Sequence, residues 1–365
     1  MRLVAHIVSV ALLTAVSGCA SDPVAGADDP GADSSPTRDA ITSADTRDPG
    51  DARAEGGDDA SVASDASDAK PAVDASVGGD AAGGSDPSLV GPYAVTKSSA
   101  TVGKATLVSF VPALPTGTRA PLVILKHGFQ LATANYAVLA ERVASHGFIV
   151  VGVDTAGGLF GGPTNVDERD ASTAAIDWAL ATAPFAATVD GEHVAVMGHS
   201  RGGKVAVMVA VADARIDAAL LLDPVDGCGP GASYSATCPN VASAAFAGAL
   251  KMPVGVMGET NNATGGFMPC APAAQNYTTI YDGLKAASWA VEWTFTGADH
   301  MDFTDDGGGT TGGFCTDGPG DDATIRLDVH TLAVAFLRRH LRGEAAMDVW
   351  LVGASLPAGI THRGP

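Results

Sequence analysis

The chain has 365 residues, a formal net charge of −20 and 46% hydrophobic residues. This length suits one large domain or two small ones, and the hydrophobic content is sufficient for a sizeable core. The acidic balance argues against a nucleic-acid-binding protein, which needs a basic face to contact phosphates. Residues 20–90 hold 16 acidic and 4 basic residues, so the N-terminal part carries much of the charge.

The N-terminus is typical of an export signal. Arg2 precedes the apolar stretch IVSVALLTAV, which is too short for a comfortable membrane span. The stretch ends in VSGC at residues 16–19 and resembles a lipobox. This resemblance implies a signal peptide at 1–18, cleavage before Cys19 and lipid attachment to its thiol. The alternatives are an ordinary signal peptide with a chance cysteine and a short uncleaved anchor.

A lipobox implies an exported bacterial lipoprotein at the outer membrane or cell surface, held to the membrane through its N-terminal lipid. Without lipidation, a periplasmic or secreted protein is expected. Residues 19–90 consist mainly of Asp, Ala, Ser, Gly and Pro. Such a segment cannot bury enough apolar surface to offset chain entropy, so we expect a disordered acidic linker. The remaining 91–365 are expected to form one catalytic domain.

From about residue 91, short apolar runs alternate with helical patterns. The predicted strands are 106–114, 121–128, 148–154, 193–200, 216–225, 252–259 and 290–297. The predicted helices are 133–147, 170–183, 201–213 and 325–341. This alternation indicates an α/β domain with a mostly parallel central sheet and helices on both faces. Functional groups in such sheets lie beyond the carboxyl ends of the strands.

The string GHSRGG, residues 198–203, lies where a strand should pass directly into a helix. This context is typical of a nucleophile elbow, in which a serine sits on a strained turn and neighbouring glycines avoid collisions. We therefore predict Ser200 as the nucleophile. The alternative is a plain glycine turn between strand and helix.

A nucleophilic serine needs a base, and the base needs an acid to orient it. His300 lies in GADHMDF after the last predicted strand, which is the expected place for the base. Asp223 ends the strand ALLLDPV and is the preferred acid, with Glu259 as the second candidate and Asp226 as the third. The backbone amides of Phe129 and Arg201 are the predicted oxyanion hole.

Several segments together resemble chlorophyllase-type α/β-hydrolases over roughly residues 110–340. They are GHSRGGK with its unusual Arg201, LLLDPVDG, the segment from VILKHGF to IVVGVD, PCAPAAQNY and GADHMDFTDD. The resemblance implies the α/β-hydrolase fold and supports Asp223 as the acid. It also implies cleavage of carboxylic esters through an acyl-enzyme on Ser200, without a cofactor. The substrate is expected to be a small-molecule, lipid or polymer ester.

Four cysteines other than Cys19 allow three pairings, and export makes disulfides plausible. We favour Cys228–Cys238 and Cys270–Cys315, the second of which would restrain the segment carrying His300. Their spacing does not match a zinc site, and no metal is expected. The acidic, glycine-rich residues 305–322 are expected to be a surface loop, with a calcium loop as the alternative.

No long insertion separates Asp223 from His300, so a large lid domain is not expected. Three other functions remain open at this point. A polyester or cutinase-type hydrolase and a serine peptidase would use the same machinery. A non-catalytic surface binding module would reuse the fold without needing all three of Ser200, Asp223 and His300.

Overall fold

The computed structural model describes residues 86–155, 162–229, 232–264 and 269–365. The chain divides into residues 1–75 and 76–365, and every described residue belongs to the second unit. The predicted signal peptide, Cys19 and the predicted linker up to residue 85 lie outside the described residues. Within the described part, no helix has the length and apolar character needed to cross a membrane.

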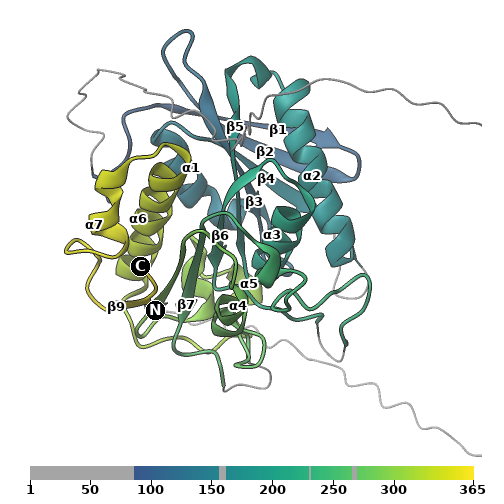
Figure 1. The fold of residues 1–365 in the computed structure, drawn as a ribbon, viewed down its shortest axis with the longest axis vertical. Helices are drawn as coiled ribbons and strands as arrows, with labels where there is room; N and C mark the ends of the chain where they lie inside the picture. Colours follow the sequence, from purple (N-terminus) through teal and green to yellow (C-terminus); the bar gives the residue numbers. More distant parts are fainter. Residues whose placement is uncertain (1–85, 156–161, 230–231, 265–268) are drawn as a thin grey trace, which may run out of the picture. The chain divides into compact units, whose positions relative to one another are not determined.

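One nine-stranded sheet runs through the described domain, in the order β1-β2-β4-β3-β5-β6-β7-β8-β9 (Figure 1). The six strands from β4 to β8 in this order are parallel, whereas β1, β2 and β9 pair antiparallel with their neighbours. The strands are β1 (Val95–Val102), β2 (Ala105–Pro112), β3 (Ala120–Lys126), β4 (Ile149–Thr155), β5 (Val189–His199), β6 (Ile216–Leu222), β7 (Val254–Glu259), β8 (Ala290–Phe295) and β9 (Ile360–Arg363). The predicted, mostly parallel sheet is confirmed.

The parallel strands are buried on both faces, which explains their nearly continuous apolar sequences. All residues of β3 and of β7 are buried. The outer strands β1 and β9 are different, because most of their residues are polar and exposed or half-buried. No strand was predicted at either place, since a short polar edge strand lacks the apolar pattern on which the prediction relied.

Helices cover both faces of the sheet, as predicted (Figure 1). One apolar core joins the sheet to α1 (Ala137–Ser145) and α6 (Asp322–Leu341). The other joins it to α2 (Asn165–Ala181), α3 (Arg201–Ala212) and α4 (Tyr277–Gly283). The short elements are α5 (Gly309–Gly312), α7 (Asp348–Leu351) and the 3-10 turns Thr133–Tyr136, Ala186–Thr188, Ala247–Ala249, His300–Phe303 and Ala345–Met347.

The acidic segment after His300 docks against α1. The Asp305 carboxylate accepts hydrogen bonds from the Val138 and Leu139 amides, two of the unpaired donors at the start of that helix. Asp306 accepts a hydrogen bond from the Asn135 side chain. Asp305 therefore pairs two amides at the start of α1, and Asp306 holds the turn that precedes this helix. No group of three or more His, Cys, Asp or Glu side chains in the described ranges could hold a metal ion.

Candidate active site

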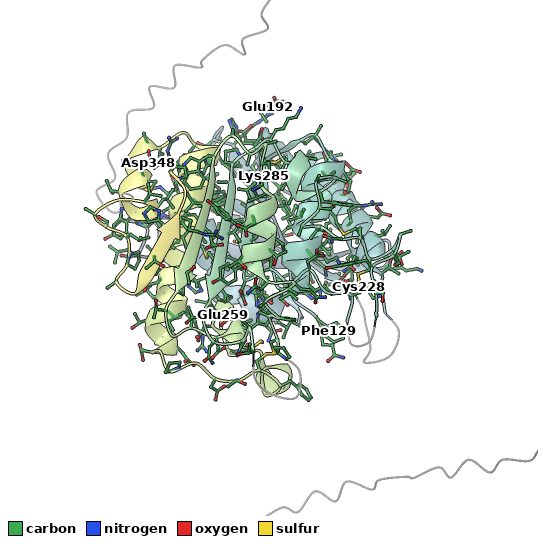
Figure 2. The ribbon with its side chains drawn as sticks, turned by 60° about the horizontal axis from the view of Figure 1, so that its bottom comes forward. Phe129, Glu192, Cys228, Glu259, Lys285 and Asp348 are labelled. Carbon is green, nitrogen blue, oxygen red and sulfur yellow. A yellow bond between two sulfur atoms is a disulfide. The ribbon has the colours of Figure 1, made fainter. Side chains whose placement is uncertain are left out.

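The carboxyl ends of the parallel strands gather the predicted site residues at one end of the sheet. Figure 2 shows Phe129, Cys228 and Glu259 toward this end, with Glu192 at the opposite end. Glu259 is the last residue of β7, whereas Glu192 lies in the first half of β5. This is the edge at which open α/β sheets place their functional groups.

Ser200 occupies the tight turn between β5 and α3, with φ 56° and ψ −124°. A non-glycine residue in this positive-φ region costs about 1–3 kcal/mol, so the surroundings must hold it. A Cβ at Gly198 would lie 2.2 Å from the Gly202 carbonyl oxygen, and a Cβ at Gly202 would lie 2.2 Å from the Lys126 carbonyl oxygen. Glycine is therefore required on both sides of Ser200, and the turn has the geometry of a nucleophile elbow.

Ser200, His300 and Asp223 form a continuous chain of side-chain hydrogen bonds. The Ser200 Oγ lies 2.9 Å from Nε2 of His300, and Nδ1 of His300 lies 2.5 Å from Oδ2 of Asp223. Asp223 is fully buried and His300 is 5% exposed. A neutral imidazole can donate its Nδ1–H to the carboxylate while Nε2 accepts the serine proton. The His300 ring thus lies within hydrogen-bond distance of both Ser200 and Asp223.

His199, the last residue of β5, holds the main chain of His300. Burial lowers the pKa of His199 well below its usual range, and the nearby His300 lowers it further, so the His199 ring is neutral. Its Nε2 donates to the His300 carbonyl oxygen at 2.9 Å, and its Nδ1 accepts the Tyr136 hydroxyl proton at 2.7 Å. The Tyr136 hydroxyl in turn accepts the Gly128 amide.

The three candidate acids have different partners. Asp223 alone of the three hydrogen-bonds to His300. Asp226 lies 2.9 Å from the Lys204 ammonium in a fully buried ion pair, and its Oδ2 accepts two backbone amides. Glu259 accepts the amides of the turn that follows β7, and burial followed by the charge of Asp223 raises its pKa to about 7.

The two predicted oxyanion donors flank Ser200. The Leu131 amide donates to the Gly128 carbonyl oxygen at 3.2 Å, and Gln130 has φ 56°, so the chain turns sharply at Phe129. A Cβ at Gly128 would lie 3.3 Å from the Ser200 Cβ, so this turn lies directly against the elbow. Among the described residues, neither the Phe129 amide nor the Arg201 amide has a hydrogen-bond acceptor. Both amides are therefore available to a ligand.

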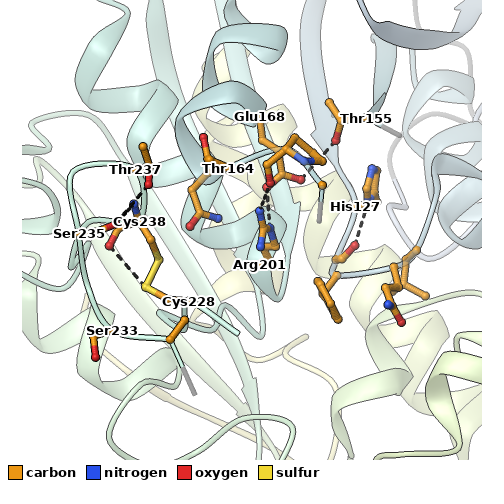
Figure 3. Close-up of a pocket in the computed structure, with 18 residues that line it drawn as sticks. His127, Thr155, Thr164, Glu168, Arg201, Cys228, Ser233, Ser235, Thr237 and Cys238 are labelled. Carbon is orange, nitrogen blue, oxygen red and sulfur yellow. Dashed lines mark hydrogen bonds and ion pairs between the residues drawn. A yellow bond between two sulfur atoms is a disulfide. The ribbon is translucent and has the colours of Figure 1, made fainter. Parts of the chain in front are cut away.

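The Arg201 side chain joins a buried charge cluster that sequence reasoning missed. Its Nε lies 2.6 Å from one oxygen of Glu168 (Figure 3). The other oxygen of Glu168 lies 3.3 Å from Nζ of Lys126. Burial lowers the pKa of Lys126 to about 8 and that of His127 to about 3. The only sequence signal was a lysine at the end of the buried strand VILK. This cluster ties α3 to α2 and β3 beside Ser200.

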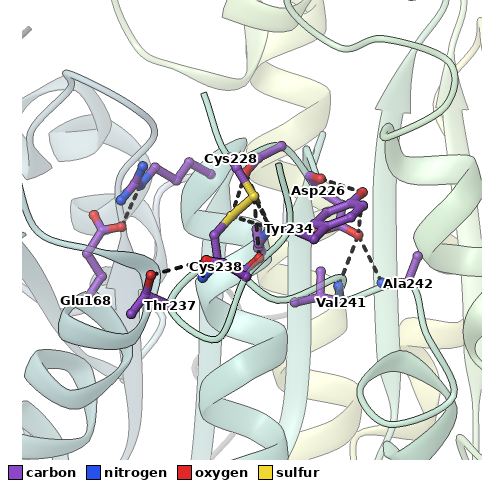
Figure 4. The surroundings of a disulfide bond; sticks show 12 residues. Glu168, Asp226, Cys228, Tyr234, Thr237, Cys238, Val241 and Ala242 are labelled. Atoms are coloured by element: carbon purple, nitrogen blue, oxygen red, sulfur yellow. Dashed lines mark hydrogen bonds and ion pairs between the residues drawn. A yellow bond between two sulfur atoms is a disulfide. The ribbon is translucent and has the colours of Figure 1, made fainter. Parts of the chain in front are cut away.

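Both favoured disulfides are confirmed. Cys228–Cys238 closes the loop that follows Asp226, and the Lys204 ammonium lies 3.1 Å from the Cys238 Sγ (Figure 4). Tyr234 from the same loop donates its hydroxyl to Asp226. The loop thus covers the buried ion pair.

Cys270–Cys315 joins the segment after β7 to the segment after His300. The Asn261 and Asn262 side chains reinforce this connection by donating to the Thr316 carbonyl oxygen, next to Cys315. The Asn262 Oδ1 also accepts the His300 amide at 2.8 Å. The backbone around His300 is therefore anchored to the β7 end of the sheet, as expected for this disulfide.

A cavity of about 560 Å³ opens beside Phe129 and Arg201 (Figure 3). Its described wall mixes a few apolar groups with many hydroxyl, amide and charged side chains: His127, Phe129, Gln130, Leu131, Thr155, Pro163, Thr164, Asn165, Glu168, Arg201, Ser233, Ser235 and Thr237, with the Cys228–Cys238 disulfide at one side. Asn165 is 2% exposed, and its Nδ2 is buried without a hydrogen-bond partner in the described part of the chain.

A mostly parallel sheet with helices on both faces, together with a serine elbow at the end of β5, defines the α/β-hydrolase class. The chain belongs to the chlorophyllase family, because the chlorophyllase family model matches residues 90–355. It is 32% identical to chlorophyllase-1 of Arabidopsis thaliana over 253 residues, covering 62% of this chain and 74% of the relative.

Chlorophyllase-2 of Arabidopsis thaliana is 30% identical over 246 residues, covering 61% of this chain and 74% of the relative. A shorter similarity links the chain to cutinase 2 of Thermobifida cellulosilytica, at 33% identity over 108 residues, 28% of this chain and 38% of the cutinase. These relationships indicate an ester-hydrolysing enzyme of the α/β-hydrolase fold.

Proposed function

We propose that this protein hydrolyses carboxylic esters through an acyl-enzyme on Ser200, with His300 as the base and Asp223 as the orienting acid. The observation that carries the proposal is the chain of hydrogen bonds from the Ser200 Oγ through His300 to the buried Asp223 carboxylate. The family relationship supports ester chemistry, and the local geometry supports the choice of residues.

The reaction follows from these positions. Nε2 of His300 takes the Ser200 hydroxyl proton as Oγ attacks the ester carbonyl carbon. The negative charge that develops on the carbonyl oxygen is stabilised by the Phe129 and Arg201 amides. His300 then gives its proton to the leaving alkoxide, which departs as the alcohol. Water then attacks the acyl-enzyme while His300 accepts its proton. His300 returns this proton to the Ser200 Oγ as the carboxylic acid is released.

The test compares the full-length protein with Ser200→Ala on p-nitrophenyl butyrate. We expect the wild type to release p-nitrophenol and to be labelled by a fluorophosphonate probe, and the variant to do neither. Ser233→Ala, in the cavity wall, is a matched control that keeps Ser200 and should still be labelled. Equal rates for wild type and Ser200→Ala would refute the proposal. A folded wild type without labelling would favour a binding module.

We also propose that the cavity receives an oxygen-containing part of the ester. The composition of the wall supports this choice, because hydroxyl, amide and charged side chains form much of its described lining. An ether or hydroxyl oxygen can accept hydrogen bonds from this wall, whereas a long alkyl chain would cover its polar groups without pairing them. The name chlorophyllase therefore does not by itself set the substrate of this chain.

The comparison uses esters of equal size. We expect wild type to prefer p-nitrophenyl methoxyacetate over p-nitrophenyl butyrate more strongly than Thr237→Val, which removes a hydroxyl of the cavity wall, by about fivefold in the ratio of kcat/KM values. Taking a ratio between enzymes removes the intrinsic reactivity of each ester. The pair 2-methoxyethyl acetate and butyl acetate tests the alcohol side in the same way. Unchanged ratios in both pairs would refute this role for the cavity. Polyesters and peptides in the same assay series test the cutinase and peptidase alternatives.

We further propose that the chain is exported and lipid-anchored through Cys19, as the VSGC sequence suggests. Labelled palmitate should be incorporated by the wild-type protein in a lipoprotein-processing bacterial host and not by Cys19→Ser. Equal incorporation in both proteins would contradict the anchor at this residue.

A further inference from the structure

Two carboxyl groups occupy neighbouring strand ends beside His300. Asp223 follows β6, Glu259 ends β7, and the Asp223 amide donates to the Met257 carbonyl oxygen at 2.9 Å. Asp223 is fully buried and Glu259 is 2% exposed. The charge of Asp223 raises the pKa of Glu259, so ionising both carboxyls in this buried place is costly. A second carboxyl here therefore requires a physical explanation.

Each carboxyl has one oxygen that accepts a hydrogen bond and one that has no partner among the described residues, and the Glu259 backbone amide further stabilises the Asp223 carboxylate. The Asp223 Oδ2 is bonded to His300, and the Glu259 Oε2 accepts the amides of Asn261 and Asn262, the latter at 2.7 Å. The Asp223 Oδ1 and the Glu259 Oε1 are both buried, and neither has a hydrogen-bond partner among the described residues. A single proton held between two such oxygens would give both of them a partner and remove one buried charge.

The surrounding charges favour Glu259 as the holder of this proton. Burial raises the pKa of both carboxyls, but His300 beside Asp223 stabilises the Asp223 carboxylate. Burial and then the Asp223 charge raise the pKa of Glu259 to about 7, against the opposing effects of the Asn262 and Asn261 amides and, smallest, of His300. Asp299 adds further negative charge near Asp223, and burial keeps Tyr277, which packs against β7, in its neutral form.

The bonded oxygen of Glu259 acts on His300 through a short chain of contacts. It fixes the turn at residues 261 and 262, and the Asn262 Oδ1 in that turn accepts the His300 amide at 2.8 Å. Nδ2 of Asn262 donates to the Thr316 carbonyl oxygen on the disulfide-linked segment. The turn that holds the His300 backbone thus contacts Glu259 directly. The Asp223 carboxylate, which is bonded to the His300 ring, interacts with Glu259 through its charge.

We propose that Glu259 is a positioning residue that keeps a proton on Oε1, donates it to the Asp223 Oδ1, and holds with Oε2 the turn that anchors His300. This role rests on the proposed function, because it concerns how the hydrogen bonds among Ser200, His300 and Asp223 are kept in place. It differs from the role of orienting acid, because Glu259 acts through Asp223 and Asn262 and does not touch the reacting atoms.

The central test is Glu259→Gln in the full-length protein. A glutamine amide can donate to Asp223 and its carbonyl oxygen can accept both turn amides, so the variant keeps the geometry and loses the titration. We expect kcat for p-nitrophenyl butyrate to stay within about threefold of wild type. Glu259→Ala removes both interactions and should lower kcat by about 10- to 100-fold with little change in KM, because small displacements of catalytic groups are costly.

A second measurement needs no substrate. The folded-state pKa of Glu259 is about 7, against 4.5 for the ordinary side chain, so the folded protein binds the extra proton between these values. The contribution of this group to stability is complete below pH 4.5 and is lost as the pH rises through 7. The wild type should therefore lose more unfolding free energy than Glu259→Gln over this window. Glu292→Gln, a buried carboxyl of β8 paired with Arg363, is the matched control and should keep the wild-type loss.

The outcomes separate the two proposals. An inactive, unlabelled wild type would overturn the proposed function, while the pH dependence of unfolding would still test the proton on Glu259. An active wild type with Glu259→Gln as impaired as Glu259→Ala would show that the carboxylate charge is required and would overturn the positioning role. Wild-type kcat in Glu259→Ala, or an identical stability slope in wild type and Glu259→Gln, would overturn it too. If Glu259→Ala does not fold, Glu259→Gln decides the question.

Discussion

Asp223 and Asp226 lie three residues apart, and exchanging each for asparagine separates catalytic orientation from structural support. Asp223→Asn keeps the shape of the side chain but replaces the carboxylate that lies 2.5 Å from Nδ1 of His300. The asparagine NH₂ group can face Nδ1 only as a donor, which favours the tautomer with the proton on Nε2. That tautomer cannot accept the Ser200 proton. Because Asp223 is fully buried, water cannot reach this position and replace the lost hydrogen-bond acceptor.

In serine hydrolases of this design, the same exchange costs about 10⁴ in kcat, or about 5.4 kcal/mol of transition-state stabilisation. We expect a loss of that order for Asp223→Asn with p-nitrophenyl butyrate. Asp226→Asn removes the charge that pairs with the buried Lys204 ammonium, so it should lower the free energy of unfolding by about 3–5 kcal/mol. The folded Asp226→Asn protein should keep kcat within about threefold of wild type.

The assay is steady-state hydrolysis at a temperature where both variants are folded by circular dichroism, with urea unfolding of each. The reasoning fails if Asp223→Asn retains near-wild-type kcat. It also fails if folded Asp226→Asn loses as much kcat as Asp223→Asn, because Asp226 makes no contact with His300.

Three further outcomes follow from other contacts. Lys204→Met leaves the Asp226 carboxylate buried without its cation and should cost about 3–5 kcal/mol of unfolding free energy, and an unchanged urea midpoint would contradict this. The paired change Cys270→Ser and Cys315→Ser opens a loop with a sequence separation of 45, which should cost about 4 kcal/mol in the chain-entropy model, measured against the oxidised wild type. Lys126 has a folded pKa of about 8 against 10.5 for the ordinary side chain, so the unfolded chain binds more protons between these values. Stability should therefore rise with pH across this window more in wild type than in Lys126→Met, and parallel curves would refute the lowered pKa.

Much of this domain could be predicted from local sequence. The buried parallel strands are nearly continuous apolar runs, and each run predicted as a strand coincides with a strand of the sheet. The elbow was also readable, because the collisions at Gly198 and Gly202 arise from the backbone of the turn itself and of the adjacent β3 strand end. The two disulfides were the favoured hypothesis among three possible pairings, and both are present.

The edge strands β1 and β9 could not be recognised in the same way. Their side chains are mostly exposed, so burial imposes no apolar pattern on them. Pairing with β2 and with β8 places them in the sheet through backbone hydrogen bonds, which any sequence without proline can make.

The sequence by itself determined the class of fold, the serine elbow and a short set of candidate partners for Ser200. Only the tertiary structure decided which carboxylate meets His300, because that contact joins residues 77 positions apart and depends on the register of β6 beside β7. The same packing pairs Asp226 with Lys204 and brings Glu259 close enough to Asp223 for their charges to interact. Asp223, Asp226 and Glu259 all carry a carboxyl group, but folding brings different groups into contact with each of them. These neighbours decide which role each carboxyl group can take.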